Sequence, residues 1–444
     1  MFRLPHPIVL MLAGVAVAAA LTWMLPAGEF DRRDDPATGR RVVVAGTYHA
    51  VDAAPVGLFQ AAVAVPRGIV AAAEVIAVVL LVGGAWVVVD RAGTLGRAVR
   101  ALVRRFRHRG LWAIPLVSLL FALMGALENM GEEIIALVPV LLLLGAGIGV
   151  DAVVVVAISV GAAAVGSAFG PTNPFQAGIA LKLAELPPLS GAGLRLAMLA
   201  AGLAAWVGWT VRYAARNRTA PVAPAVDAGD RLTGRDALIL ALAILPMAFY
   251  VYGALALGWG FNELSGAFLA SGVAIGLLAR LGVAGTTETF LEGMQAMLPA
   301  ALMVGVARSI SLVLEDGRVI DTILHGLATP LGTVPATVAA LLMVPFHAVL
   351  HLPVPSVSGH AALTMPVLVP LSDLLGLSRQ VTVLAYQTGG GLMELLAPTN
   401  GVLMAVLLGA RVPYQQWLRF ALGGWLLLTL VGVAGILVAM ASAG

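Results

Sequence analysis

Long apolar runs separated by short polar segments dominate the pattern along this chain. Seven of them are long enough for an α-helix to cross a bilayer, which takes about 20 residues. They lie at residues 7–27, 66–89, 190–212, 236–256, 258–280, 296–314 and 417–441. The first run resembles a signal peptide only weakly, because it is long for one and Ala19-Ala20-Leu21 is a poor cleavage site. We therefore expect it to be retained as the first helix.

Two further apolar segments, 150–186 and 377–410, are each interrupted by the tripeptide Pro-Thr-Asn. Proline removes a backbone donor and ends or kinks a helix. Each segment is therefore predicted to be a discontinuous helix, made of a half-helix, an unwound loop and a second half-helix.

Residues 111–146 and 334–374 each contain an apolar run, a short polar tip and a second apolar run. The pattern allows either two spanning helices or a re-entrant hairpin that enters and leaves on one side. Hairpins give nine crossings and a cytoplasmic N-terminus, with 16 of the 26 Lys and Arg residues inside. A full crossing at 111–128 would instead place an arginine-rich cluster outside, against the positive-inside tendency. The charges therefore favour hairpins.

The two interrupted segments belong to an internal repeat. Shifting the chain by 227 residues aligns 139–173 with 366–400 without a gap, and ten of the 35 positions are identical. A repeat of this size means two copies of one structural unit. The predicted fold is an all-α polytopic membrane protein with two inverted repeats, each holding a re-entrant hairpin and a discontinuous helix.

The repeat also divides the chain. The first scaffold region is 1–110, with an outer loop at 28–64 and a cytoplasmic amphipathic helix at 94–109. Residues 111–212 form the first transport region, with hairpin 111–146 and broken helix 150–186. After a linker at 213–235, residues 236–333 form the second scaffold region. The second transport region is 334–444, with hairpin 334–374 and broken helix 377–410.

Composition excludes several classes of protein. The chain is 60% hydrophobic and 11% charged, whereas a soluble domain carries about 25% charged residues. It contains no cysteine, which excludes disulfides, thiol catalysis and cysteine metal sites. The net charge is +3, and the basic residues gather in loops, as topology control requires. Nucleic-acid binding is not expected.

The Pro-Thr-Asn loops are the first candidate site. Backbone groups freed by unwinding must find partners inside the bilayer. Unwound carbonyls and the oxygens of Thr172, Asn173, Thr399 and Asn400 suit Na⁺, and the helix N-termini that follow suit a carboxylate. The simpler interpretation is that proline kinks two core helices and asparagine caps them. The two copies at one offset favour a binding site.

The hairpin tips are the second candidate. In the repeat alignment Asn129 matches Ser356, Gly131 matches Ser358, and Glu133 matches His360. Acidic and imidazole groups at such depth are costly unless paired, which marks Glu128, Glu132, Glu133 and His360 as functional candidates. Capping of a helix N-terminus is an equally good account of Glu132 or Glu133.

Other intramembrane groups complete the candidates. Arg308 lies mid-helix and is expected to pair with an acid such as Glu394, rather than to bind a substrate carboxylate. Glu394 aligns with Ser167, so the site is not chemically symmetric. Glu394 or His360 are candidates for a coupled proton. His347 and His351 lie one turn apart, but a metal site there is not favoured because the usual acidic ligand is missing.

The candidate residues fall into three groups. Predicted substrate-binding residues are Asn129, Gly131, Thr172, Asn173, Ser356, Ser358, His360, Thr399 and Asn400. Predicted ion-coupling residues are Glu132, Glu133, Gln387, Thr388 and Glu394, and Arg308 is assigned to charge pairing. No resident cofactor is expected; the coupling ion is Na⁺ or H⁺, with Na⁺ predicted at Asn129, Asn173, Ser356 and Asn400.

The chain resembles the YfcC/DcuC-type carriers of the ion transporter superfamily. The resemblance covers nearly the whole length and rests on five motifs. These are residues 26–31 (PAGEFD), 46–49 (GTYH), 173–175 (NPF), 358–366 (SGHAALTMP) and 398–405 (PTNGVLMA). The chain departs from the family pattern at 389–391, where an acid is expected, and at His360, where glutamine is expected.

The resemblance implies an ion-coupled carrier of the inner membrane, commonly a homodimer, with a scaffold and a moving transport domain. Members are labelled as four-carbon dicarboxylate carriers or basic amino-acid antiporters. We therefore expect a non-enzymatic secondary transporter of a small carboxylate or amino acid, working by an elevator motion. The alternatives are an exchanger of basic amino acids, a channel and, remotely, an intramembrane serine hydrolase using Ser358.

Overall fold

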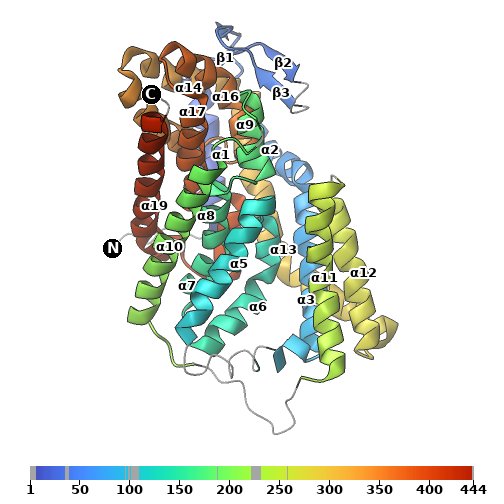
Figure 1. The fold of residues 1–444 in the computed structure, drawn as a ribbon. Coiled ribbons are helices and arrows are strands. Elements are labelled where there is room, and N and C mark those ends of the chain that lie inside the picture. The colour runs from blue at the N-terminus through green and yellow to red at the C-terminus, as the bar shows by residue number, and fades with distance from the viewer. Residues whose placement is uncertain are drawn as a thin grey trace.

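The computed structural model describes residues 7–35, 40–95, 97–98, 101, 110–187, 189–221, 232–257 and 259–442 of the 444-residue chain. Helices dominate these residues (Figure 1). Six of the described helices are long and apolar enough to cross a membrane, and shorter apolar helices accompany them. The chain is therefore an all-α polytopic membrane protein, which confirms the predicted class.

The first half starts with α1 (Pro7–Met24). Two small antiparallel ribbons follow, in which β1 (Gly28–Glu29) pairs with β4 (His49–Ala50), and β2 (Arg32–Asp35) pairs with β3 (Arg40–Val43). The helices after them are α2 (Leu58–Ala71), α3 (Ala73–Arg91), η1 (Gly110–Trp112), α5 (Ala113–Glu128), α6 (Glu132–Ile148), α7 (Ala152–Val156), η2 (Ala157–Gly161), α8 (Ala162–Phe169), η3 (Pro174–Gly178), α9 (Ile179–Leu183) and α10 (Ala192–Arg216).

The second half repeats this order. Its elements are α11 (Gly234–Ala256), α12 (Phe261–Leu278), α13 (Gly282–Asp316), α14 (Ile320–Ala328), η4 (Thr329–Thr333), α15 (Ala336–Leu350), α16 (Val357–Leu374), α17 (Arg379–Tyr386), η5 (Gln387–Gly391), α18 (Gly401–Gly409) and α19 (Tyr414–Ser442). The segments η2, η3 and η5 are π-helical, a form that appears mostly as single turns at functional sites.

The offset of 227 residues found in the sequence also relates the elements. Adding 227 to the start of α1 gives 234, where α11 begins. Adding it to 58–91, the span of α2 and α3, gives 285–318, close to α13 at 282–316. Adding it to α10 gives 419–443, close to α19 at 414–442. Only α12 lacks a helical counterpart among the described residues, because its equivalent positions fall in the ribbons.

Several sequence-based boundaries are wrong. The crossing expected at 66–89 is two helices, α2 and α3, separated at Ala72. The crossing expected at 296–314 is the longer α13, which begins at Gly282, before the apolar stretch, and in these added turns exposed Glu292 pairs with Arg91. The outer loop at 28–64 contains the ribbons and the start of α2. Most of the amphipathic segment 94–109 and of the linker 213–235 lies outside the described residues.

The two helix hairpins open toward opposite ends of the molecule (Figure 1). In hairpin 1, made of α5 and α6, the outer ends cluster with the last turns of α10, and Gly149 O accepts from Thr219 N at 3.2 Å. In hairpin 2, made of α15 and α16, the outer ends lie by η4 and the β3 ribbon. Each broken helix runs beside the hairpin of its own half. This arrangement brings both tips toward the middle of the molecule.

Hairpin 1 packs on its broken helix through two glycines. A Cβ on Gly166 of α8 would lie 1.9 Å from the carbonyl oxygen of Ala122 in α5. A Cβ on Gly125 of α5 would lie 2.1 Å from the carbonyl oxygen of Ala163. Small residues of this kind let two membrane helices approach to backbone contact. The tip of hairpin 1 is therefore held at a fixed height against α8.

Gly166→Ala is expected to lower the free energy of unfolding by about 1–3 kcal/mol, the usual penalty for overpacking a core. Gly208→Ala is the matched control, since Gly208 is exposed on α10 and a Cβ there meets nothing within 4 Å. That change should stabilise by up to about 1 kcal/mol through helix propensity. Thermal melts of the purified protein in detergent measure both. Equal melting of the two variants would contradict this packing.

Candidate functional site

A cavity of about 1530 Å³ lies where the two hairpin tips meet. Residues 129–133 line it from hairpin 1 and residues 354–359 from hairpin 2. The second broken helix contributes Glu394 and residues 399–403, and α13 contributes Arg308. Both hairpin tips therefore line the same cavity. The first helical turns of α6, α16 and α18 all border the cavity, and helix N-termini carry a partial positive charge.

Asparagine caps the half-helix that follows each break. Asn173 Oδ1 accepts from the backbone N–H groups of Phe175 and Gln176, both at 2.9 Å. Asn400 Oδ1 accepts from the N–H groups of Val402 at 2.9 Å and Leu403 at 3.1 Å. The caps satisfy amide groups that the unwound loops would otherwise leave unpaired. The asparagine of each Pro-Thr-Asn motif thus caps the half-helix that follows it.

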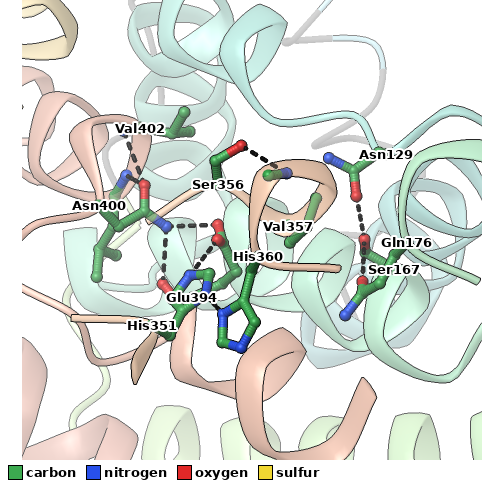
Figure 2. A network of polar contacts seen from close by, with 12 residues as sticks. Asn129, Ser167, Gln176, His351, Ser356, Val357, His360, Glu394, Asn400 and Val402 are labelled. Carbon is green, nitrogen blue, oxygen red and sulfur yellow. Dashed lines mark hydrogen bonds and ion pairs between the residues drawn. The ribbon is translucent and has the colours of Figure 1, made fainter. Parts of the chain in front are cut away.

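In the first half, the cap is tied directly to hairpin 1. Asn173 Nδ2 donates to Gly125 O at 2.9 Å and lies within 3.0 Å of Asn129 Oδ1. Thr172 donates to Ala126 O at 2.7 Å. Ser167 of α8 donates to Asn129 and lies 3.0 Å from Gln176 Oε1 (Figure 2). Thr172 and Asn173 are not lining residues of the cavity: Asn173 is buried and bonds to Asn129 and Ser167, which do line it, and Thr172 is exposed elsewhere.

In the second half, a carboxylate makes the same connection. Asn400 Nδ2 donates to Glu394 Oε2 at 2.6 Å, and Glu394 Oε1 lies 2.6 Å from Nε2 of His351 at the end of α15 (Figure 2). Glu394 therefore joins the cap of α18 to hairpin 2. Ser167, its partner in the repeat alignment, joins the first cap to hairpin 1. The position is equivalent in the two halves, but it is charged only in the second.

Three histidines extend from Glu394 into the protein. His351 Nδ1 lies 3.3 Å from His360 Nδ1, and His360 Nε2 lies 2.9 Å from His347 Nδ1. All three side chains are fully buried. His360 faces these histidines and is not a lining residue of the cavity, and no hydrogen bond joins it to Ser358 among the described residues. The chain of rings does not converge on one point, and no metal-binding cluster occurs among the described residues.

The acidic residues of hairpin 1 have separate environments. Glu133 is buried and accepts from Gly131 N at 3.1 Å, so it caps the start of α6. Glu132 lines the cavity beside it. Arg308 pairs with Glu315 at 3.5 Å, and both side chains are partly exposed. Arg308 therefore makes the charge pair expected of it, but with Glu315 in place of Glu394, because Glu315 lies two turns away on the same helix and is reached more easily.

The remaining candidates divide between the cavity and the core. Ser356 caps α16 by accepting from Gly359 N at 3.3 Å, and Gly131 and Ser358 line the cavity. Thr399 Oγ1 borders the cavity, is buried and has no partner among the described residues. Gln387 and Thr388 do not line the cavity. Gln387 accepts from Arg195 Nε at 2.7 Å, and Thr388 packs on Gly432. The side chain of Glu128 lies outside the described residues.

Sequence reasoning missed the partners that complete these networks. Ser167 and Gln176 on one side, and His347 and His351 on the other, contact predicted site residues. Two signals were present: the alignment of Ser167 with Glu394, and the one-turn spacing of the two histidines. Neither signal says which residues meet across a loop.

The profile of the family described as "C4-dicarboxylate anaerobic carrier" (DcuC) matches residues 4–441. The Escherichia coli (strain K12) protein named "Putative basic amino acid antiporter YfcC" is 32% identical over 473 aligned residues, covering 94% of this chain and 92% of that protein. An uncharacterized Haemophilus influenzae protein is 26% identical, covering 95% and 94%. The Alcanivorax borkumensis YdaH transporter structure matches at 19% identity with a TM-score of 0.44, covering 98% of both chains.

Asn173→Ala is expected to lower the free energy of unfolding by about 2 kcal/mol or more, because it removes a cap and leaves buried groups unpaired. Asn217→Ala is the matched control, since Asn217 is exposed at the end of α10 and makes one bond, to Tyr213 O at 2.9 Å. Its loss should change stability by less than about 0.5 kcal/mol. Melting curves in detergent measure both, and a similar shift in the two variants would refute the capping role.

Proposed function

The chain belongs to the C4-dicarboxylate anaerobic carrier family, and from that premise we propose that it is an ion-coupled secondary transporter of a small carboxylate or amino acid. The family is described as a carrier, and the 32% identical Escherichia coli relative is named as an antiporter, so the chain is a membrane transporter and not an enzyme. The proposal concerns the substrate, the coupling ion and the mode of movement.

One observation carries the proposal: both hairpin tips and the second capped helix break line one cavity in the middle of an apolar protein, and the first capped break bonds to Asn129 and Ser167, which line it. Irregular backbone is tolerated inside a bilayer only where it is buried in protein or lines a water-filled cavity. Breaks in corresponding positions of two halves are typical of substrate sites in secondary transporters. The cavity is therefore the proposed substrate site, with Thr399 Oγ1 as a buried group beside it that has no partner among the described residues.

The charges around the cavity favour a substrate that carries an amino group. Glu132, Glu133 and Glu394 line it close to the tips, whereas Arg308, which also lines it, already has Glu315 as a partner. The helix N-termini of α6, α16 and α18 suit the carboxylate of the same molecule. An amino acid satisfies both requirements. This acid excess is also the reason to keep exchange of basic amino acids as the second candidate.

The arrangement of the hairpins supports an elevator motion. Because they open toward opposite ends, they would be re-entrant loops of two inverted repeats. Helices α3, α11, α12 and α13 share a separate apolar core, which is the proposed scaffold. The arginine-rich end would face the cytoplasm, giving nine crossings with the N-terminus inside the inner membrane. A homodimer through the scaffold is proposed from the family resemblance.

A resident Na⁺ site at the four oxygens predicted from the sequence fits poorly. The side-chain oxygens of Asn129, Asn173 and Asn400 each accept at least two hydrogen bonds, and Ser356 Oγ accepts one. A cation there would have to displace these donors, and with them the caps of the half-helices. Na⁺ coupling through other oxygens and H⁺ coupling both remain within the proposal.

Purified protein in liposomes is expected to exchange internal unlabelled substrate for external labelled substrate, tested with L-arginine, L-lysine and succinate. Glu132→Gln should lower the exchange of the amino acids by about tenfold or more, the effect of losing one charge-assisted contact. Glu185→Gln is the matched control, since Glu185 is 76% exposed and pairs with Arg379 far from the cavity. Absence of exchange with all three compounds, or equal rates in the two variants, would contradict the proposed site.

A further inference from the structure

Glu394 is the one acidic side chain of the second broken helix, and it is held on both oxygens. Oε1 lies 2.6 Å from His351 Nε2, and Oε2 accepts from Asn400 Nδ2 at 2.6 Å (Figure 2). The side chain is 26% exposed, and that exposed part faces the cavity. The carboxylate therefore touches the end of hairpin 2, the cap of α18 and the cavity at the same time.

The histidines behind it can all be neutral while Glu394 is ionised. His351 then donates from Nε2 to Glu394 and accepts at Nδ1 from His360. His360 in turn accepts at Nε2 from His347 Nδ1. His347 Nε2 is left without a proton. This agrees with its position, since it is buried and has no partner among the described residues, and an unpaired acceptor there costs less than an unpaired N–H.

This hydrogen-bonded series of side chains reaches the cavity at one end only. Glu394 reaches the cavity, whereas His347, His351 and His360 are fully buried. A proton can therefore be exchanged with water only at Glu394, and only on the side to which the cavity is open. A site with a single access route can carry a proton across a membrane together with the moving domain without forming a continuous leak.

We propose that Glu394 is the binding site of the coupling proton, held in place by the three histidines. The inference rests on the proposed transport function and names its coupling ion as H⁺. In the step itself, hydronium in the cavity gives its proton to a carboxylate oxygen of Glu394 and leaves as water. No other bond forms or breaks, and the three imidazoles stay neutral.

Protonation changes how hairpin 2 is held. The ionised carboxylate accepts from His351 and from Asn400, and hydrogen bonds to an ionised group are about twice as strong as neutral ones. When Glu394 is protonated, these hydrogen bonds weaken. One of its oxygens then carries a hydrogen that faces the N–H donor of His351 or of Asn400. The link between hairpin 2 and the cap of α18 is therefore weakened. Proton binding and movement of hairpin 2 become coupled through one side chain.

The groups that face this site come from every neighbouring element. His347 and His351 belong to α15, His360 to α16 and Asn400 to the loop before α18. The Tyr386 ring of α17 lies 5.5 Å from those of His347 and His360, and its hydroxyl donates to Val357 O at 2.5 Å. Across the cavity are the acids Glu132 and Glu133 of α6 and, on α13, Arg308 with its partner Glu315.

The proton site is tested without a substrate by infrared difference spectroscopy of the protein in nanodiscs between alkaline and acidic pH. The carboxylic-acid band of Glu394 should appear on acidification in the native protein and be absent from Glu394→Gln. Glu185→Gln, an exposed glutamate elsewhere, should keep the band. A pH-dependent band that is the same in the native protein and Glu394→Gln overturns the assignment.

The positioning role of His360 is tested with His360→Gln. Glutamine can hold hydrogen bonds on both sides but has no titrating nitrogen, so it keeps the spacing and alters the support of His351. The midpoint of the Glu394 band should move by about one pH unit, equivalent to a tenfold change in proton affinity. His325→Gln on α14, an exposed histidine stacked on Tyr48, should not move it. If Glu394→Gln does not fold, the His360→Gln midpoint decides: an unchanged midpoint overturns the proposal.

Coupling is tested in liposomes with L-arginine and succinate. For one proton moved per substrate, a gradient of one pH unit should sustain about tenfold accumulation by the native protein. Glu394→Gln should give no accumulation under the same gradient. Equal accumulation by the two proteins overturns the coupling role. Failure of the native protein to exchange either compound without a gradient would instead overturn the proposed transport function, and the infrared titration would still decide the proton site.

Discussion

The structure depends on one constraint: backbone amide groups freed by a helix break cannot remain unpaired inside an apolar protein. Two such breaks occur here, and each is resolved by an asparagine side chain. Asn173 and Asn400 each accept from two backbone N–H groups of the half-helix that follows. The remaining amide hydrogens of each asparagine then bind groups that fix the neighbouring hairpin. Solving the local problem of the break therefore also places the tips, and the cavity is the space between them.

The symmetry of the two halves is structural, and the chemistry departs from it at one position. Ser167 and Glu394 occupy equivalent places and make equivalent connections between cap and hairpin. A serine hydroxyl makes this link without charge, so hairpin 1 is held in the same way at any pH. A carboxylate makes a stronger link that depends on protonation. Two hairpins held by the same link would respond to protonation in the same way. Here the Ser167 link carries no titrating group, whereas the Glu394 link can respond to a proton.

Much of this could be predicted from the sequence because it depends on covalent order. Proline positions locate the breaks, and the 227-residue repeat implies that Asn129 and Ser356 are equivalent and that both tips approach one site. The predictions that failed concern where a helix ends and which way its side chains face. The end of α13 was missed because an exposed helix can continue beyond its apolar stretch. Arg308 was assigned the wrong acid, since hydropathy says nothing of which helix face a side chain occupies.

The three linked histidines show that spacing along one helix does not predict which residue of another helix will contact it. Spacing along α15 puts His347 and His351 on one face, but only the return of the chain through α16 inserts His360 between them. Glutamine at this position would bridge the same two neighbours without a titrating ring. His360 lies two hydrogen bonds from Glu394, through His351, so its ring fixes how His351 is turned toward the carboxylate. A change at residue 360 can therefore alter how tightly Glu394 holds a proton, while the caps and the cavity stay as they are.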